Sequence, residues 1–239
     1  MTQPAQVMSG GLTLRPVADA VEITKTGAAW LADAIDRIVA ARGRCVLAVS
    51  GGRSPWPMFE RLVETPGVPW AHVHVIQVDE RAAPDSHQDR NWTSAQQVFG
   101  SVLPAEQLHP MAVTSDDPVA AAADYGLLID RLCDGEIDIV HLGLGPDGHT
   151  ASLFPDDPIL SVVDRAVAWT TYEHMGRLRM SVTLPTLARA QNVMWQIGGF
   201  DKHMMLTRLL EGDGEIPAGR VRRDRAVVIA DAAALGTQG

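Results

Sequence analysis

Residues 137–155 read IDIVHLGLGPDGHTASLFP, and the two halves of this stretch predict a fold and a site. The first half, from Ile137 to Leu142, is mostly apolar and reads as a buried strand. A strand of this kind is typical of a parallel sheet that helices cover on both faces. The second half is a glycine-rich turn with polar side chains, and it follows the strand directly.

Similar apolar segments recur along the chain and alternate with amphipathic ones. Strands are predicted over residues 44–50, 73–80, 137–145, 166–172, 179–184, 192–198 and 226–231. Helices are predicted over residues 27–42, 57–64, 118–133 and 201–212. This alternation favours an α/β fold of three layers, α/β/α, around a mainly parallel, Rossmann-like sheet. We expect a single domain over residues 1–239, with a small subdomain around residues 82–115.

Composition and charge narrow the class of protein. The 239 residues are 46% hydrophobic, enough for a sizeable core, and the net charge of −9 argues against broad nucleic-acid binding. The longest apolar runs fall far short of the roughly 20 residues that a membrane helix needs. The segment MTQPAQVMSGG lacks the features of a secretory signal, and the two cysteines, Cys45 and Cys133, read as buried thiols. We therefore expect a cytoplasmic protein without nucleic-acid or membrane partners.

The spacing of Gly143, Gly145 and Gly148 fits the G-x-G-x-x-G pattern that cradles a dinucleotide pyrophosphate. In that pattern a helix of several turns follows the third glycine. Here Pro146 lies inside the turn and Pro155 follows soon after it, so there is no room for such a helix. The turn therefore does not predict a dinucleotide, and we expect no cofactor.

A catalytic interpretation of the same turn rests on His149 and Asp147. An imidazole titrates near neutral pH and serves as an acid or a base, and a carboxylate two residues away would orient it or hold a substrate hydroxyl. The alternative is a turn histidine that only bonds to backbone, and the residues alone do not separate the two. Ser152 lacks the G-x-S-x-G setting of a nucleophilic serine.

Two further loops follow predicted strands, where ligands bind in α/β sheets. The loop SGGRSP, residues 50–55, precedes a helix that a proline opens, so its backbone N–H groups are either an anion site or part of a plain tight turn. It lacks the G-K-[ST] ending of a P-loop. The triplet DER, residues 79–81, ends an apolar strand and is either a solvated edge or part of a site.

Four cations lie near these loops in the predicted fold: Arg53, Arg81, Arg179 and Lys202. Each one alone reads as a surface charge, but together they could converge on a phosphate. A metal site is not indicated, because the eight histidines do not have the usual ligand spacing. His72 and His74 share a strand face without an evident third ligand, so no metal is expected.

The chain resembles the 6-phosphogluconolactonases, whose superfamily also contains the glucosamine-6-phosphate deaminases. The resemblance covers nearly the whole chain, and DGHTASLFP is its most specific motif. The deaminases carry DEY where this chain has DER, and a phenylalanine, an asparagine and a glutamate where it has SLFP, so both motifs favour the lactonase. The other matching features are SGG before a proline, Asn91, the R-x-S-x-T pattern of residues 179–183, Lys202 after two glycines and a phenylalanine–aspartate pair, IPA and DAAA.

Three features depart from the family pattern. Arg53 stands where the family usually has serine or threonine, and Arg90 stands where it has serine. The loop YEHMGRL before Arg179 lacks the proline-rich stretch of the family. These departures concern the contacts to the substrate phosphate more than the reaction.

The resemblance implies a carboxylic ester hydrolase that converts 6-phospho-D-glucono-1,5-lactone to 6-phosphogluconate, the second step of the oxidative pentose phosphate pathway. In this scheme His149 takes a proton from the attacking water and returns it to the ring oxygen, while Asp147 holds the imidazole or a sugar hydroxyl. Arg81 and loop N–H groups stabilise the oxyanion. Asp79 and Glu80 position Arg81. The substrate-binding residues would be Ser50, Gly51, Gly52, Arg53, Ser54, Asp79, Glu80, Asn91, Gly145, Arg179 and Lys202.

A monomer that acts on a small phosphosugar lactone is the expectation that follows. Two other interpretations remain open. One is a deaminase or isomerase of amino-sugar phosphates, and the other is a non-catalytic sugar-phosphate sensor. Sensors of that type usually carry a basic helix-turn-helix segment, for which this chain has no spare length.

Overall fold

A computed structural model describes residues 4–237 of the chain. Residues 1–3 and 238–239 lie outside the described part, and with them the first residues of the N-terminal segment considered above and both ends of the expected domain.

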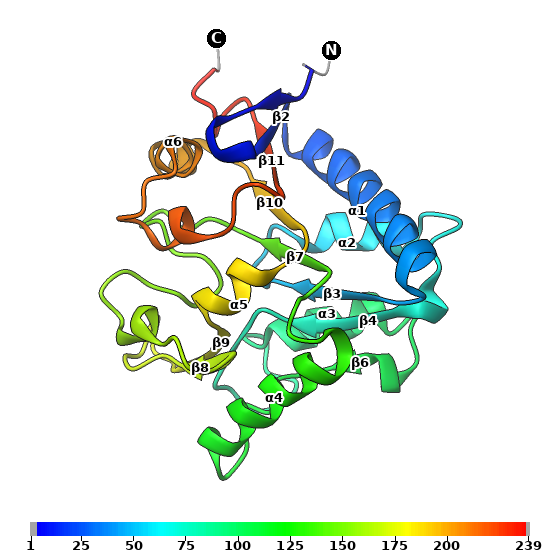
Figure 1. Ribbon diagram of the computed structural model, residues 1–239, viewed down its shortest axis with the longest axis vertical. Coiled ribbons are helices and arrows are strands. Elements are labelled where there is room, and N and C mark those ends of the chain that lie inside the picture. The colour runs from blue at the N-terminus through cyan, green and yellow to red at the C-terminus, as the bar shows by residue number, and fades with distance from the viewer. Residues whose placement is uncertain (1–3, 238–239) are drawn as a thin grey trace.

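The larger of two sheets has eight strands and forms the middle layer (Figure 1). Its one antiparallel pair is β1 with β2, and all its other neighbouring strands are parallel, as expected. Across the sheet, the order is β1 (Gln6–Val7), β2 (Thr13–Val17), β11 (Ala226–Asp231), β10 (Val193–Ile197), β7 (Ile139–Leu142), β3 (Cys45–Val49), β4 (Val73–Gln77) and β6 (Leu108–His109).

Helices cover both faces of this sheet, which confirms the three-layer α/β/α prediction. One core cluster packs the first face against α1 (Ala20–Arg42), α2 (Trp56–Val63) and α3 (Asn91–Phe99). The other cluster packs the second face against α4 (Pro118–Cys133), α5 (Leu184–Arg189), α6 (His203–Glu211) and a second, smaller sheet. Figure 1 shows α1 and α2 on one side of the large sheet and α5 and α6 on the other. Over residues 4–237, none of the helices combines the length and the apolar character that crossing a membrane requires.

The first helix begins seven residues earlier than predicted, at Ala20 rather than Gly27. Asp19 caps it, because its carboxylate accepts a hydrogen bond of 2.9 Å from the N–H of Glu22. An aspartate with a glutamate three residues later is a known signal for a helix start, and it places the start of this helix before Gly27. Gly43, with φ of 77°, ends the helix in a left-handed conformation.

The smaller sheet is antiparallel and contains β5 (Asp79–Arg81), β9 (Arg179–Val182) and β8 (Val167–Trp169). The single strand predicted over residues 73–80 was therefore wrong, as was the placement of residues 166–172 and 179–184 in the parallel sheet. The N–H of Val78 bonds to Val49 of the large sheet, and the carbonyl of Val78 accepts from Val182 of the small one. The chain changes sheets at Val78, and hydrophobic periodicity carries no information about such a change.

The segment 82–115 does not form the small subdomain that was predicted. It contributes α3 to one helical layer, and its short strand β6 extends the edge of the large sheet by pairing with β4. The additional unit of the fold is instead the antiparallel sheet, whose strands come from well-separated parts of the chain.

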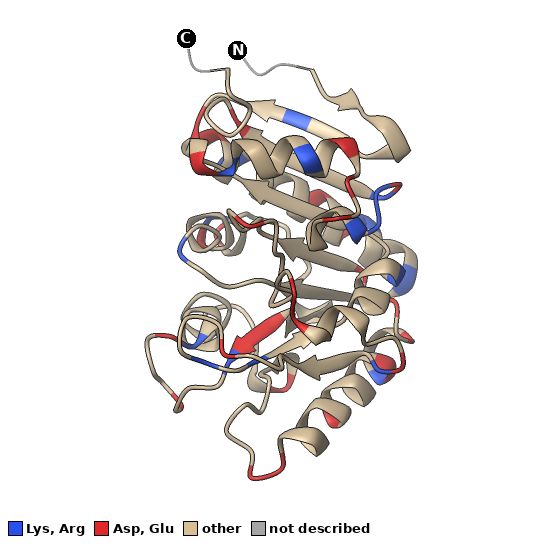
Figure 2. Ribbon diagram, turned by 90° about the vertical axis from the view of Figure 1, so that its left-hand side faces the viewer, with Lys and Arg blue, Asp and Glu red and all other residues tan. Residues whose placement is uncertain are grey.

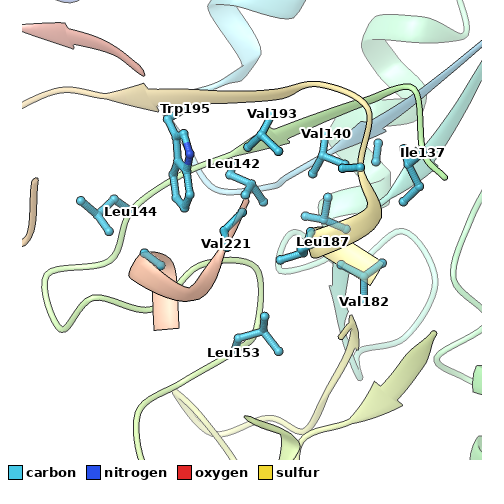
Figure 3. Close-up of a cluster of buried hydrophobic side chains, with 14 of the residues drawn as sticks. Ile137, Val140, Leu142, Leu144, Leu153, Val182, Leu187, Val193, Trp195 and Val221 are labelled. Carbon is cyan, nitrogen blue, oxygen red and sulfur yellow. The ribbon is translucent and has the colours of Figure 1, made fainter. Parts of the chain in front are cut away.

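The carboxyl ends of β3 and β7 mark the place where the large sheet reverses its order. These strands are neighbours, yet the chain continues from β3 toward β4 on one side and from β7 toward β10 on the other. Loops that leave two such strands diverge and open a crevice for ligands. The loop after β7 is anchored at both ends, because Leu144 and Leu153 are buried with Leu142 and Trp195 in one apolar cluster (Figure 3).

Candidate active site

A cavity of about 810 Å³ occupies this crevice and extends to the smaller sheet. It brings together most of the residues predicted from the sequence, although they come from six separate parts of the chain. Asp147 and Glu80 are the two predicted residues that do not line it. Those that line it are Ser50, Gly51, Gly52, Arg53, Ser54, Asp79, Arg81, Asn91, Gly145, His149, Arg179 and Lys202.

His149 and Asp147 form a close pair at the cavity. The imidazole Nδ1 lies 2.5 Å from Asp147 Oδ1, and the same oxygen accepts the His149 N–H at 3.1 Å. Partial burial would raise the pKa of Asp147, but the hydrogen bond and the charge of His149 lower it to about 2. The carboxylate therefore stays ionised and holds the proton on Nδ1, which leaves Nε2 as the basic atom of the neutral ring.

An aromatic stack supports this imidazole. The Phe154 ring lies 4.4 Å from the ring of His149 and stacks at 3.7 Å on His174. His174 is fixed in turn by the buried carboxylate of Asp157, at 2.9 Å. The guanidinium of Arg179 lies 5.5 Å from the centre of the Phe154 ring. The stack ties the loop that carries His149 to the strand that carries Arg179.

Gly145 contributes to the site because it has no side chain. The N–H of Gly145 donates to the carbonyl of His149 at 2.8 Å. This N–H is therefore not among the loop N–H groups that could stabilise an oxyanion. A Cβ at this position would overlap Nδ1 of His149 and crowd Oδ1 of Asp147. Glycine here is what allows the histidine–aspartate pair to form.

The SGGRSP loop passes close over the first residue of α3. A Cβ on Gly51 would overlap the side-chain oxygen of Asn91, whose amide nitrogen donates to the carbonyl of Asp79 at 3.1 Å. Within residues 4–237, the N–H groups of residues 51–54 donate no hydrogen bond to the backbone. A loop with several free N–H groups before a helix is a suitable anion site.

Arg81 and Arg179 lie opposite each other in the antiparallel pairing of β5 and β9. Arg81 donates from Nη1 to the carbonyl of Asp89 at 2.7 Å, and Arg179 donates from Nη2 to the carbonyl of His174 at 3.1 Å. The Nε of each arginine is buried without a hydrogen-bond partner. Like charges directly opposite destabilise a strand pair, so this arrangement favours anionic groups of a ligand beside the two guanidinium groups.

Asp79 is the buried countercharge beside Arg179. Its Oδ2 accepts the hydroxyl of Ser152 at 2.6 Å. Burial raises the pKa of Asp79, and the Ser152 hydrogen bond and Arg179 oppose that rise. Burial likewise lowers the pKa of Arg179, and Asp79 opposes the change. Ser152 therefore positions Asp79, a role that the sequence did not indicate.

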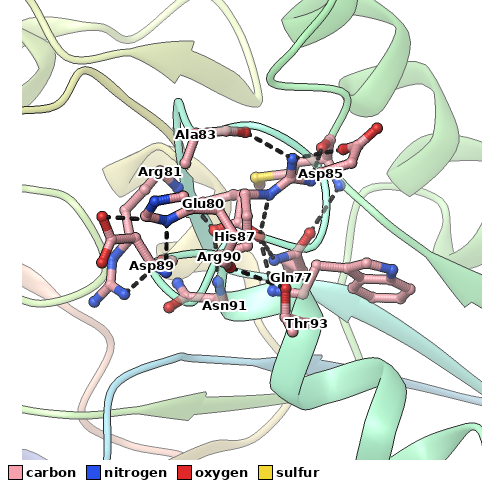
Figure 4. Close-up of polar contacts among 12 residues, drawn as sticks. Gln77, Glu80, Arg81, Ala83, Asp85, His87, Asp89, Arg90, Asn91 and Thr93 are labelled. Carbon is pink, nitrogen blue, oxygen red and sulfur yellow. Dashed lines mark hydrogen bonds and ion pairs between the residues drawn. The ribbon is translucent and has the colours of Figure 1, made fainter.

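Glu80 is fully buried and holds a loop in place (Figure 4). Its two oxygens accept from the side chain of Gln77 and from the N–H groups of Arg81, Asn91 and Trp92, all at 2.8–2.9 Å. The prediction that Glu80 positions Arg81 thus applies to its backbone, because no bond to the guanidinium is present among the described residues.

Arg90, one of the departures from the family pattern, is the partner of Glu80. Its Nε lies 3.1 Å from Glu80 Oε2, and Nη1 donates to Asp85 and to the carbonyl of Ala83 (Figure 4). Nη2 reaches the carbonyl of Met111 at 3.4 Å. Arg90 is therefore a buried brace for residues 82–90 and lies outside the lining of the cavity.

The two remaining cations line the cavity with fewer contacts. Lys202 ends a 3-10 turn (Phe200–Lys202) before α6, and its Nζ lies 3.0 Å from Asp201. Arg53 has an exposed side chain on the SGGRSP loop. His141 and Gln196 also line the cavity and were missed in the sequence. The signal for His141 was a histidine inside an otherwise apolar strand.

Comparisons with known proteins point to one family. The model of the family described as Glucosamine-6-phosphate isomerases/6-phosphogluconolactonase matches residues 18–229. A 6-phosphogluconolactonase of Synechocystis sp. is 33% identical over 189 residues, which are 76% of this chain and 78% of that protein. A crystal structure of 6-phosphogluconolactonase from Thermotoga maritima has a TM-score of 0.82 and 25% identity, and the match covers 91% of this chain and 98% of that chain.

A monomeric glucosamine-6-phosphate deaminase is similar in structure as well. Its TM-score is 0.81 with 18% identity, and the match covers 94% of this chain and 99% of that chain. At that identity the likeness shows the fold alone. The fold by itself therefore does not separate lactone hydrolysis from deamination.

Proposed function

This chain belongs to the glucosamine-6-phosphate isomerase/6-phosphogluconolactonase family, and from that premise we propose that it hydrolyses 6-phospho-D-glucono-1,5-lactone to 6-phosphogluconate. This reaction is the second step of the oxidative pentose phosphate pathway. The observation that carries the proposal is a cavity lined by His149, which Asp147 holds from behind, and by the opposed arginines Arg81 and Arg179. Hydrolysis of a phosphorylated ester requires a base to activate water and an anion site to bind the phosphate, and this cavity contains both.

His149 is the proposed general base. A lactone is an activated ester, so a positioned water suffices as the nucleophile. Nε2 of His149 accepts a proton from the attacking water, and the imidazolium then returns this proton to the departing ring oxygen. Asp147, whose pKa is lowered to about 2, remains an anion and stabilises the imidazolium.

The cations divide into two groups in this proposal. Arg81 is assigned to the developing oxyanion, and Arg179, Lys202 and the free N–H groups of residues 51–54 are assigned to the phosphate. Because Arg81 and Arg179 are direct neighbours, the phosphate and the oxyanion sites are adjacent. Fixing the phosphate then orients the lactone carbonyl relative to His149.

We further propose a monomer that acts in the cytoplasm and binds no nucleic acid. The net charge of −9 supports the last point, because nucleic-acid binding relies on a basic surface. In Figure 2 acidic and basic residues are interspersed, and most strands of the large sheet carry neither. Cys45 and Cys133 are buried and unpaired, which fits a reducing compartment.

The test is a continuous assay at low temperature, where spontaneous hydrolysis is slow. Glucose 6-phosphate is oxidised enzymatically to the lactone. The 6-phosphogluconate that forms when the lactone is hydrolysed is then followed through 6-phosphogluconate dehydrogenase. We expect the protein to accelerate hydrolysis of the lactone in proportion to the concentration of the protein. Ammonia release from glucosamine 6-phosphate would identify a deaminase instead, and binding of 6-phosphogluconate without acceleration would identify a sensor.

A further inference from the structure

A chain of three polar side chains lies beneath the SGGRSP loop. The hydroxyl of Ser50, at the end of β3, lies 2.8 Å from Nδ1 of His141 on β7. Nε2 of His141 lies 3.1 Å from Oε1 of Gln196 on β10. Nε2 of Gln196 donates to the carbonyl of Ser54 at 3.0 Å. This row of hydrogen bonds therefore begins and ends on the same loop and crosses three neighbouring strands.

The direction of every hydrogen bond in this chain follows from its last member. A carbonyl only accepts, so the Gln196 amide nitrogen must face Ser54 and its oxygen must face His141. An amide oxygen also only accepts, so Nε2 of His141 carries a proton. In a neutral imidazole Nδ1 is then unprotonated, and the Ser50 hydroxyl must donate its one proton to it.

The surroundings of His141 keep it neutral. The side chain is 1% exposed, and its ring packs edge-on against Phe59 with centres 5.0 Å apart. Burial lowers the pKa of His141 to about 4, although the hydrogen bond to Gln196 opposes this. An isolated charge at this position would have to be removed from water without a countercharge. The neutral ring with a proton on Nε2 is the form present at neutral pH.

Among these three side chains, Ser50 is the one whose remaining hydrogen-bonding capacity matters for a ligand. Its hydroxyl proton is committed to His141, and the residue lines the cavity. The oxygen thus offers the cavity lone pairs and no proton. A phosphate oxygen, itself an acceptor, would be repelled by it, whereas a hydroxyl group would donate to it.

We propose that His141 is a positioning residue that fixes Ser50 as a hydrogen-bond acceptor, and that Ser50 thereby binds a hydroxyl group of the sugar rather than its phosphate. This assignment rests on the proposed function for the identity of the ligand. It refines the role expected of Ser50, because the phosphate is left to the N–H groups of residues 51–54 and to the cations. It also gives a role to a histidine that the reaction scheme does not use.

The first test reads the hydrogen positions in the intact protein. Two-dimensional ¹⁵N NMR distinguishes a protonated from an unprotonated ring nitrogen, and His141→Asn identifies the signals by their loss. We expect His141 to show a protonated Nε2 and an unprotonated Nδ1 at neutral pH. A protonated Nδ1 would overturn the proposal, because Ser50 would then be free to donate into the cavity.

The second test measures binding of two probes, 6-phosphogluconate and inorganic phosphate, to Ser50→Ala by calorimetry. Loss of one neutral hydrogen bond should weaken 6-phosphogluconate binding about 3- to 10-fold and leave phosphate binding unchanged. His141→Leu removes the acceptor for the Ser50 proton and should impair 6-phosphogluconate binding, while His141→Asn supplies an amide oxygen and should restore part of it. Thermal unfolding of each variant separates these effects from loss of the fold.

A weaker affinity of Ser50→Ala for inorganic phosphate would show that Ser50 binds the phosphate and would refute the inference. Failure of the wild-type protein to bind 6-phosphogluconate would refute the proposed function instead. In that case the NMR result still decides whether Ser50 presents an acceptor to the cavity.

Discussion

At the scale of single residues, the proposed chemistry depends first on the imidazole of His149. We expect His149→Ala to lower kcat about 100-fold or more, the usual contribution of a positioned general base. KM should change much less, because the phosphate dominates binding. The matched control is His72→Ala, since His72 precedes β4 and lies at the opposite, amino edge of the sheet. A folded His149→Ala protein with near-normal kcat would rule out this base.

Asp147 gives a prediction about pH. In the folded protein the pKa of Asp147 is lowered from its ordinary value of 3.8 to about 2, so the unfolded state binds the proton more readily. The pair with His149 therefore stabilises the fold at pH values above 3.8. That contribution is lost as pH falls from about 4 to about 2. Urea unfolding should therefore show Asp147→Asn less stable than wild type near neutral pH and equal to it at the acid end. The effect is small because the side chain is 48% exposed. A stability difference that grows on acidification would contradict this sign.

Lys202 separates binding from chemistry more cleanly than Arg179, which is buried beside Asp79 and whose loss would also disturb the fold. Lys202→Ala should raise KM for the phosphorylated lactone about 10- to 150-fold, through loss of one charged contact worth about 1.5–3 kcal/mol. It should not affect hydrolysis of unphosphorylated gluconolactone. Arg37→Ala, which removes an exposed cation on α1, serves as the control. Equal losses on both lactones would show that Lys202 does not bind the phosphate.

At the scale of elements, the loop after β7 offers a matched pair of glycines. A Cβ on Gly145 would overlap the His149 ring, whereas a Cβ on Gly143 would meet nothing within 4 Å. Gly145→Ala should therefore displace the histidine–aspartate pair and lower kcat, with a modest change in stability because a ring can rotate away. Gly143→Ala should leave the histidine–aspartate pair in place and so retain more activity than Gly145→Ala. Steady-state kinetics and thermal unfolding of both proteins test this, and equal activities would show that the pair tolerates the displacement.

Some elements could be predicted from the sequence and others could not. The helix over residues 118–133 matches α4 in both bounds, because a proline opens it and its apolar stripe is long. The break at Val78 was missed, because the choice between two sheets depends on pairing partners distant in sequence. The same limit applied to His141, whose contacts with Ser50 and Gln196 join three strands. Residues of the DER and DGH motifs could be predicted because both motifs follow closely after an apolar strand.

At the scale of the whole molecule, we predict that activity needs no metal ion. Within residues 4–237 no three histidine, cysteine, aspartate or glutamate side chains are grouped to hold one, and the reactivity of the lactone removes the chemical need. Dialysis against EDTA and assay in metal-free buffer should leave kcat unchanged. Activity that disappears and returns with zinc or magnesium would replace the histidine-activated water with a metal-bound hydroxide.

The position of β11 has a consequence for biosynthesis. This last strand lies between β2 and β10, so β2 is made early but has no parallel neighbour until residues 226–231 leave the ribosome. During that interval β10 presents an unpaired edge, and such edges bind other chains. The nascent polypeptide therefore remains open to aggregation until residues 226–231 have been translated. A premature stop before β11 should yield insoluble protein, even though it spares every residue of the His149 loop and the arginine pair.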